Sequence, residues 1–560
     1  MYLKQFSNTL KKREQWIFAG ILLLLFVLFA FRQQYGFNKN DEIFYISTVY
    51  RFFQGDAMLI DEWNNVQMFA FLTYPLYCFA QLFIRSNEGI VLIFRIFYLV
   101  FQAAVAVYCY TRMKRFGWVR IFPALFYFMT TPFNINALSY NTLAFGFVLV
   151  TLVTMASVEE WRPRHAFLCG IFTACAVLAN PYAVLLFVLY GVICLGDAVH
   201  CVRKKENPAP ILSLKNFVWM GLGAFTICVL FFAFIFSRGS IAEIMESLSY
   251  IVMDSERQKS FWWKLGRYFI RIHRYYTAQV YVTAALVILF LIDRKKRIPS
   301  WLYISLEILT TIPYIIYYGF FWEMVGINYM LIPLAFPGFI AYLVTRERDR
   351  RLFWCWYVPG LFYTLIAHFA TNTGILTVSA SCMIASAASV LLLCEALSEE
   401  HGWKKSLLWV LLAVQCAACI YQRIFYVWGD EHLEYLTETL EEGPLKGIHT
   451  TEENALLYEE VLTDMEELEL TGEDKLFVVG IAPWMYLNTD AECAAYSTWE
   501  TLETDELIAV YYELHPEKLP TVIYCYEYDE SILDTDFAQT FLDMGYGVQT
   551  MRHGLVLTLR

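Results

Sequence analysis

The chain has 560 residues, of which 58% are hydrophobic, 18% aromatic and only 17% charged, which excludes an ordinary soluble globular protein and is typical of a multi-pass membrane protein. Residues 429–560 contain 5 Lys or Arg against 30 Asp or Glu, whereas residues 1–428 carry a net charge of +14. We therefore expect a membrane part over 1–428 and an acidic water-soluble part over 429–560, with no basic patch that would indicate a nucleic-acid partner.

The first apolar segment, 16–33, follows Lys11, Lys12 and Arg13 and has no small-residue cleavage site behind it. We interpret it as an uncleaved first span with its N-terminus in the cytoplasm. Further apolar segments of membrane length lie at 89–111, 119–133, 140–157, 166–179, 182–199, 216–236, 275–292, 300–318, 327–345, 352–369, 375–397 and 406–428. Asn180-Pro181 separates two of them, because a proline can end a helix. Basic residues concentrate in alternate loops, which predicts about thirteen spans and an outer C-terminal part.

The first long outer loop, 32–88, begins its polar stretch with Asp41-Glu42. Acidic residues at a membrane boundary are functional candidates, because charge is costly to hold near hydrocarbon. The apolar and polar spacing of residues 41–55 predicts a helix that lies on the membrane surface. Helix-capping acids are the alternative interpretation of Asp41-Glu42. A second acidic pair, Asp61-Glu62, lies in the same loop.

The second long outer loop, 237–274, is rich in arginine, against the usual bias of outer loops. Guanidinium groups bind phosphate or pyrophosphate as forks, although a loop lying on anionic lipid head groups would have the same composition. Arg95 lies six residues inside the second span and needs Asp41, Glu42 or a lipid phosphate as a partner, unless it extends to the interface. The candidate phosphate-binding residues are Arg95, Arg238, Arg267, Arg271 and Arg274.

An Asp-Glu pair opening the first outer loop, followed by an Arg early in the second span, resembles the GT-C superfamily of membrane glycosyltransferases, in particular the protein O-mannosyltransferase and aminoarabinose transferase group. The segment Leu138-Ser-Tyr140-Asn141-Thr142 resembles a family segment that usually carries an Asp where this chain has Asn141. Asn180-Pro181 stands where many relatives have a Lys shortly before a Pro. The resemblance implies two juxtamembrane helices, at about 41–54 and 64–84, with Asp61-Glu62 as a cap of the second rather than a catalytic pair. The similarity covers residues 1–190 most specifically.

The resemblance implies transfer of a sugar from a polyprenyl-phosphate donor to a hydroxyl of a glycan, lipid or protein acceptor at the outer face of the cell membrane. Asp41 would be the general base, and Glu42 would orient the acceptor or pair with Arg95. Tyr140, Asn141 and Asp61 would position the substrates. No cofactor or metal is predicted; a divalent cation would be compatible, but no motif indicates one. A flippase, a polymerase or a secondary transporter is the alternative, although a transporter should show internal repeats, and none is found.

The acidic C-terminal part is predicted to follow a helical stalk at 430–442. Helical spacing covers 452–468, 505–514 and 536–542, and short buried strands are expected at 475–480, 520–525 and 553–559. This alternation predicts a small α/β domain of parallel character. The resemblance implies that such a domain positions the acceptor, and a purely structural lid is the alternative. The spacing of Cys493 and Cys525 does not decide whether they form a disulfide. The expected fold is thus an α-helical, GT-C-like membrane protein with its N-terminus inside and a small outer α/β domain.

Overall fold

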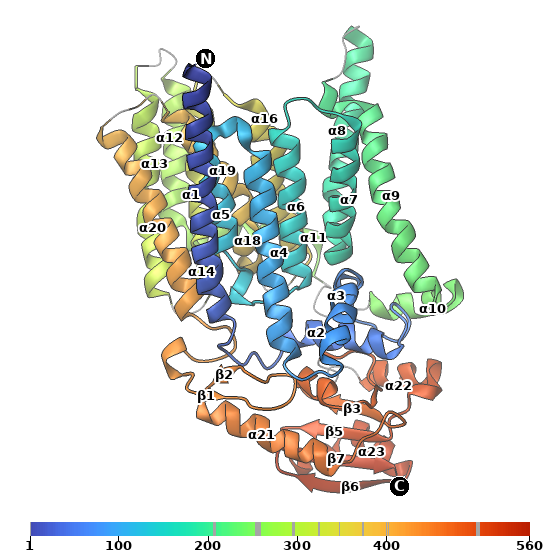
Figure 1. The fold of residues 1–560 in the computed structure, drawn as a ribbon. Coiled ribbons are helices and arrows are strands. Elements are labelled where there is room, and N and C mark those ends of the chain that lie inside the picture. The colour runs from blue at the N-terminus through green and yellow to red at the C-terminus, as the bar shows by residue number, and fades with distance from the viewer. Residues whose placement is uncertain are drawn as a thin grey trace.

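The computed structural model describes residues 2–204, 209–252, 259–293, 297–322, 325–346, 348–371, 374–398, 400, 402–499 and 505–559. A bundle of helices carries a small sheet at one end, and the N-terminus lies at the opposite end (Figure 1). We call the end that carries the sheet the sheet end. Of the basic inner loops expected from the sequence, Lys205 and residues 294–296 lie outside the described residues.

The helices of the first 428 residues are long in the bundle and short where the chain turns. Their bounds are α1 Tyr2–Arg32, α2 Asp41–Gln54, α3 Phe69–Ile84, α4 Ile90–Arg112, α5 Ile121–Met129, α6 Tyr140–Ser157, α7 Pro163–Ala179, α8 Val184–Lys204, α9 Leu214–Phe236, α10 Ile241–Ile251, α11 Phe261–Tyr275, α12 Thr277–Ile292, α13 Ser300–Ile316, α14 Gly326–Tyr329, α15 Leu331–Val344, α16 Arg350–Leu352, α17 Val358–Phe369, α18 Ile375–Ser381, α19 Met383–Ala396 and α20 Trp403–Phe425.

All thirteen predicted spans coincide with helices, but not all of these helices are long enough to cross a membrane. Among the described residues nine helices have the necessary length and apolarity, or eleven if two bent pairs, α11 with α12 and α18 with α19, are each one span. The remaining two predicted spans are α5, with 9 residues, and α7, with 17. The expected break at Asn180-Pro181 is confirmed, because α7 ends at Ala179 and α8 begins at Val184.

The outer helices of the bundle expose apolar side chains, whereas close contacts inside it depend on small residues. In the most apolar stretch of each of α1, α8 and α9, less than a quarter of the residues are buried. This is the surface expected of helices that contact lipid tails. Helices α7 and α9 cross at two glycines: a Cβ on Gly170 would lie 1.9 Å from the Met220 carbonyl oxygen, and one on Gly223 would lie 2.0 Å from that of Phe167. Small residues allow such close backbone approach in membrane helices.

At the sheet end, α2 begins and ends where the first juxtamembrane helix was predicted. It does not lie open on a membrane surface, because residues 42–52 are all buried, and the helix packs against α3, α4 and the sheet strand β4. Helix α3 begins later than predicted, at Phe69, and its N-cap Met68 makes no side-chain bond. The prediction that Asp61-Glu62 caps this helix is therefore wrong.

The C-terminal residues form a five-stranded sheet in the order β4-β3-β5-β7-β6. Strand β3 pairs in parallel with β4 and β5, whereas β7 is antiparallel to both β5 and β6, so the predicted α/β layer is confirmed but is mixed rather than parallel. The predicted helices are also present, and the sequence missed β4 and β6. The bounds are α21 Glu452–Glu467, α22 Asp505–Leu514, α23 Asp536–Asp543, β3 Lys475–Val479, β4 Glu492–Cys493, β5 Val522–Tyr526, β6 Tyr546–Met551 and β7 Gly554–Leu559.

The predicted helical stalk at 430–442 is absent from this described segment. It contains one short 3₁₀ turn, η8 (Leu433–Tyr435), followed by β1 (Glu438–Thr439), which pairs with β2 (His449–Thr450). Pairing with a strand further along the chain has replaced the local helical preference here. Cys493 and Cys525 are both buried and free, so they form no disulfide.

Candidate active site

Asp41 lies in the first turn of α2, where the Asn40 side chain accepts a hydrogen bond from its backbone N–H at 2.7 Å. Its carboxylate accepts a hydrogen bond from the indole nitrogen of Trp428, which follows α20, at 3.0 Å. No Lys, Arg or His of the described chain forms an ion pair with it. Burial raises the pKa of Asp41 above its ordinary value, and the Trp428 bond lowers it by less. Asp41 therefore has the environment of a carboxylate with increased basicity.

The neighbouring Glu42 has a different environment, because it is paired with Arg95 of α4. The guanidinium donates from Nε and Nη2 to the two carboxylate oxygens at 2.6 and 2.7 Å, and both side chains are 3% exposed. The remaining N–H groups of Arg95 donate to the carbonyls of Gln33 and Gly36, both at 2.6 Å, and of Tyr35 at 3.2 Å. Arg95 thus joins α4, α2 and the end of α1.

This arrangement decides between the partners that the sequence left open for Arg95, because Glu42 is the one found. All five guanidinium N–H groups are directed to protein acceptors, so none remains for a lipid phosphate. Arg95 is also not at the lipid interface, being almost fully buried. Its expected role at the donor phosphate would require these bonds to be exchanged.

Tyr140, at the start of α6, is brought to the same end of α2 as Asp41. Its ring lies 5.9 Å from that of Tyr45, measured between ring centroids, and Tyr45 is one turn along α2 from Asp41. The pKa of Tyr45 is raised, mainly by burial and then by the nearby Tyr140 and Asp41. Asn141 is buried beside Tyr140, and its predicted contact with substrate stays a prediction.

Two asparagines that the sequence analysis missed lie close to this carboxylate pair. Asn134 and Asn136 are buried in the turn before α6, and the Oδ1 atom of each has no hydrogen bond among the described residues. Together with Glu42, Arg95 and Trp428 they line a polar cavity of about 10 Å³. A cavity of that size holds about one water molecule. Their sequence signal was the spacing Asn-Ile-Asn within an otherwise apolar stretch.

The four candidate arginines of the second outer loop separate into two groups. Arg238 is used within the protein, because its guanidinium donates to the carbonyl of Phe52 and, at 3.0 Å each, to the Asp56 carbonyl and the Tyr74 hydroxyl. The other three, Arg267, Arg271 and Arg274, recur at spacings of four and three residues and so share one face of α11.

On that face, Arg271 is held against a glycine at the start of α18. A Cβ on Gly374 would lie only 1.0 Å from the Arg271 Nη1 atom, and the φ of +69° favours glycine there as well. Arg267 lies over the ring of Trp263 at 5.1 Å, and Arg274 is exposed. Helix α18 packs against both α11 and η2 (Pro132–Asn134), so the arginine face and the asparagine turn border one element.

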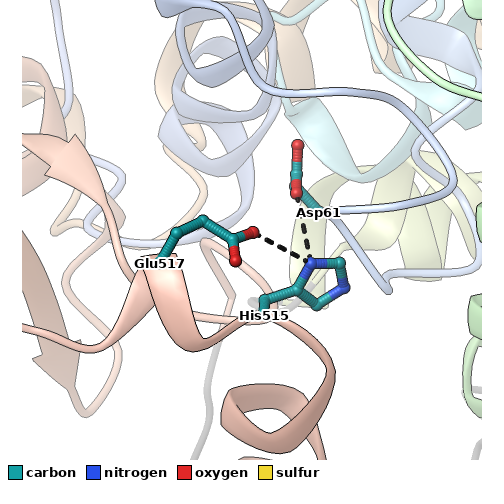
Figure 2. A group of neighbouring side chains, drawn as sticks. All are labelled: Asp61, His515 and Glu517. Atoms are coloured by element: carbon teal, nitrogen blue, oxygen red, sulfur yellow. Dashed lines mark ion pairs between the residues drawn. The ribbon is translucent and has the colours of Figure 1, made fainter.

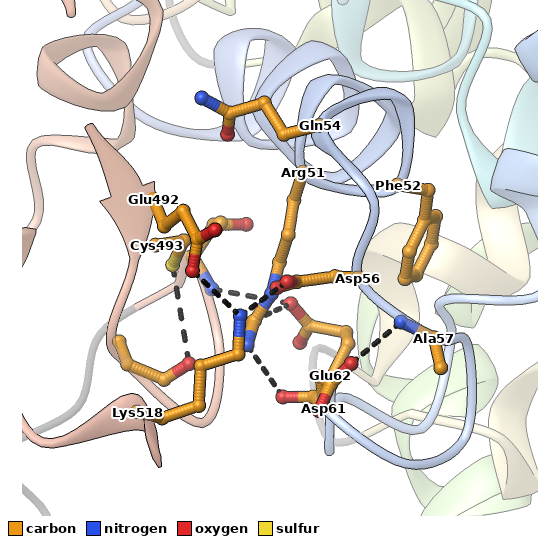
Figure 3. Close-up of polar contacts among 12 residues, drawn as sticks. Arg51, Phe52, Gln54, Asp56, Ala57, Asp61, Glu62, Glu492, Cys493 and Lys518 are labelled. Carbon is orange, nitrogen blue, oxygen red and sulfur yellow. Dashed lines mark hydrogen bonds and ion pairs between the residues drawn. The ribbon is translucent and has the colours of Figure 1, made fainter. Parts of the chain in front are cut away.

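Asp61 lies in a second polar cluster, between the first outer loop and the C-terminal sheet (Figure 3). Its centre is Arg51, 1% exposed, which pairs with Asp56 and, at 3.1 Å, with Glu62. Lys518 of the turn η10 (Pro516–Lys518) also pairs with Asp56. Arg51 lies ten residues after Asp41, about 15 Å along α2. The structure therefore does not place Asp61 in contact with Asp41.

Comparisons with known proteins give similarity to solved structures only. No family model matches the chain, and no curated protein does. A structure of the Archaeoglobus fulgidus oligosaccharyltransferase tethered with an acceptor peptide is similar over 97% of this chain and 74% of its own, with a TM-score of 0.45 and 9% identity. ArnT from Cupriavidus metallidurans, bound to undecaprenyl phosphate, is similar over 97% of each chain, with a TM-score of 0.42 and 10% identity.

Proposed function

We propose that the chain is a membrane glycosyltransferase that takes a sugar from a polyprenyl-phosphate donor and transfers it to an acceptor hydroxyl at the sheet end. The observation that carries the proposal is the difference between two adjacent acids. Glu42 is neutralised by Arg95, whereas Asp41 is mostly buried, has no cationic partner among the described residues and borders a polar cavity through Trp428. A carboxylate kept in that condition is suited to accept a proton.

In the proposed reaction the acceptor oxygen attacks the anomeric carbon of the sugar, and the bond from that carbon to the phosphate oxygen breaks. The acceptor proton goes to Asp41, and the departing phosphate retains the bonding electron pair. Cations stabilise the charge that grows on the phosphate. Arg267, Arg271 and Arg274 of α11 supply these cations, because Arg95 and Arg238 already bind protein acceptors. Tyr140, Asn141 and the cavity asparagines position the substrates.

We further propose that the sheet end lies outside the cell membrane. The expected inner loops carry the basic residues and the C-terminal residues are acidic, which is the distribution of an inside and an outside surface. Asp41 and the sheet occupy the same end of the bundle (Figure 1). The acceptor would then be a glycan, lipid or protein of the cell envelope.

The test is transfer of labelled sugar from a panel of polyprenyl-phosphate sugars by the purified protein in nanodiscs. Asp41→Asn should lower the rate by about 10²–10⁴-fold, the usual contribution of a general base, without changing donor binding. In the wild type the rate should fall as the pH drops through the raised pKa of Asp41, above the range of an ordinary aspartate.

The control is Asp490→Asn, which removes an exposed acid of the C-terminal part and should leave the rate unchanged. Wild-type turnover in the Asp41 variant would contradict the assignment of the base. Passage of intact donor across a liposome membrane, without cleavage of the sugar, would support the alternative of a flippase.

A further inference from the structure

Three potential metal ligands from distant parts of the chain meet at the interface between the first outer loop and the C-terminal part (Figure 2). Asp61 lies in the loop between α2 and α3, His515 directly follows α22, and Glu517 lies in η10. The His515 Nδ1 atom is 3.7 Å from an Asp61 carboxylate oxygen and 3.4 Å from one of Glu517. The three ligand atoms all lie within 4.8 Å of one another.

These separations are too long for ordinary hydrogen bonds but suit ligands that share a metal ion. N–H···O bonds in proteins have heavy-atom distances of about 2.7–3.2 Å. Ligand atoms bound tetrahedrally to zinc, each about 2.0–2.1 Å from the ion, are about 3.4 Å apart. The two measured distances from His515 therefore lie closer to the spacing of coligands.

The charges around the cluster favour a cation at this position. Arg51 is already paired with Asp56 and Glu62, and Lys518 is paired with Asp56 and lies 3.6 Å from Glu492. Asp61, whose side chain is 14% exposed, has no Lys or Arg ion-pair partner in the described part of the chain. A buried carboxylate without a cation is costly, and a divalent ion would remove that cost.

The imidazole of His515 is also held in a fixed position with its Nδ1 atom available. His515 is 8% exposed, and its ring packs against Tyr511 at 4.9 Å and Trp63 at 6.2 Å between centroids. Its Nε2 atom is buried and makes no hydrogen bond among the described residues. Its Nδ1 atom faces the carboxylates of Asp61 and Glu517, and with the imidazole proton on Nε2 it presents its lone pair to a metal between them.

We propose that Asp61, His515 and Glu517 bind one divalent ion of the zinc class, with a fourth position open to water. One imidazole nitrogen and two carboxylate oxygens form a ligand set that zinc accepts. The ion joins the first outer loop to the turn after α22 and so fastens the C-terminal part to the membrane bundle. This site is separate from Asp41 and does not depend on the transferase activity. Sequence spacing gave no sign of it, because one ligand is far from the other two.

The test measures zinc bound to the full-length purified protein, first stripped with chelator and then equilibrated with micromolar zinc. The wild type should retain about one equivalent more zinc than Glu517→Gln and His515→Ala, and zinc should raise its Tm but not theirs. Glu517 has a side chain that is 63% exposed, so its substitution should leave the metal-free fold intact.

The matched control is His553→Gln, which removes another histidine of the C-terminal part, one whose imidazole contacts a single acid, Glu460, at 2.5 Å. It should bind as much zinc as the wild type. Equal zinc content in the wild type and the Glu517 variant would overturn the proposal. Zinc binding absent from the wild type would overturn it too.

Discussion

Asp41 and Glu42 are adjacent in the sequence, yet α2 directs them to different partners. Successive side chains on a helix point about 100° apart, since 3.6 residues make one turn. Glu42 therefore contacts Arg95 of α4, whereas Asp41 contacts Trp428 from a segment that follows the last bundle helix. The pair could be recognised from its place after the first span, but its division of roles depends on contacts with residues far away in the chain.

At the residue scale we predict that Arg95 acts mainly through the fold. Arg95→Lys should lower the Tm, because an ammonium cannot form the fork to Glu42 and the three carbonyl contacts together. Glu42→Gln should also lower it, since breaking a buried ion pair costs about 3–5 kcal/mol. Thermal unfolding in detergent measures both.

Binding of polyprenyl phosphate below the Tm provides the contrast for Arg95. Neither variant should change it, because the guanidinium has no N–H left for a phosphate. An Arg95→Lys protein with unchanged Tm but lost phosphate binding would restore the role expected from the sequence.

At the scale of elements, apolar periodicity predicted the positions of the helices better than it predicted which of them cross the whole bundle. Helix α2 has the predicted bounds, and the break at Asn180-Pro181 is present. The segment 119–133 failed as a full span because α5 ends at Met129, before the buried turn that carries Asn134. Such a turn is satisfied by tertiary contacts, as in the bond from Phe133 N–H to the Asn328 side chain, which a local pattern does not contain.

The second prediction concerns α11, whose arginine face we propose as the phosphate site. Arg271→Gln should weaken binding of polyprenyl phosphate by about 10–100-fold, the value of one hydrogen bond to a charged group. Gly374→Ala should weaken binding as well, without removing any charge, because its added Cβ would occupy the place of the Arg271 Nη1 atom. Equilibrium binding in nanodiscs measures both effects.

Arg85→Gln serves as the control for α11, because Arg85 is an exposed arginine of the first outer loop, outside the proposed site. Its affinity for polyprenyl phosphate should equal that of the wild type. If the Arg85 variant lost as much affinity as the Arg271 variant, general attraction of the anionic lipid would explain the binding and α11 would have no special role.

At the scale of the whole molecule, composition predicted the two parts, and the structure shows what joins them. The first outer loop supplies Asp56 and the C-terminal part supplies Lys518, which pair beside the buried Arg51 (Figure 3). Each is an ordinary charged residue in its own stretch of sequence. Their pairing could not be inferred without knowing that the loop and the turn after α22 meet, so the sequence predicted the parts but not their interface.

The last prediction is the orientation of the molecule in the cell membrane. Glu473 is exposed on the C-terminal part, and Glu159 is exposed between α6 and α7. Helix α6 has 18 residues and begins beside Tyr45 at the sheet end, so Glu159 lies about 27 Å away, at the opposite end.

In a Cys228→Ser background, which removes the one exposed cysteine of the described chain, Glu473→Cys should react with an impermeant maleimide on intact cells. Glu159→Cys should react only after permeabilisation. The reverse pattern would place Asp41 and the acceptor on the cytoplasmic face, and the proposed reaction would then have to use cytoplasmic acceptors.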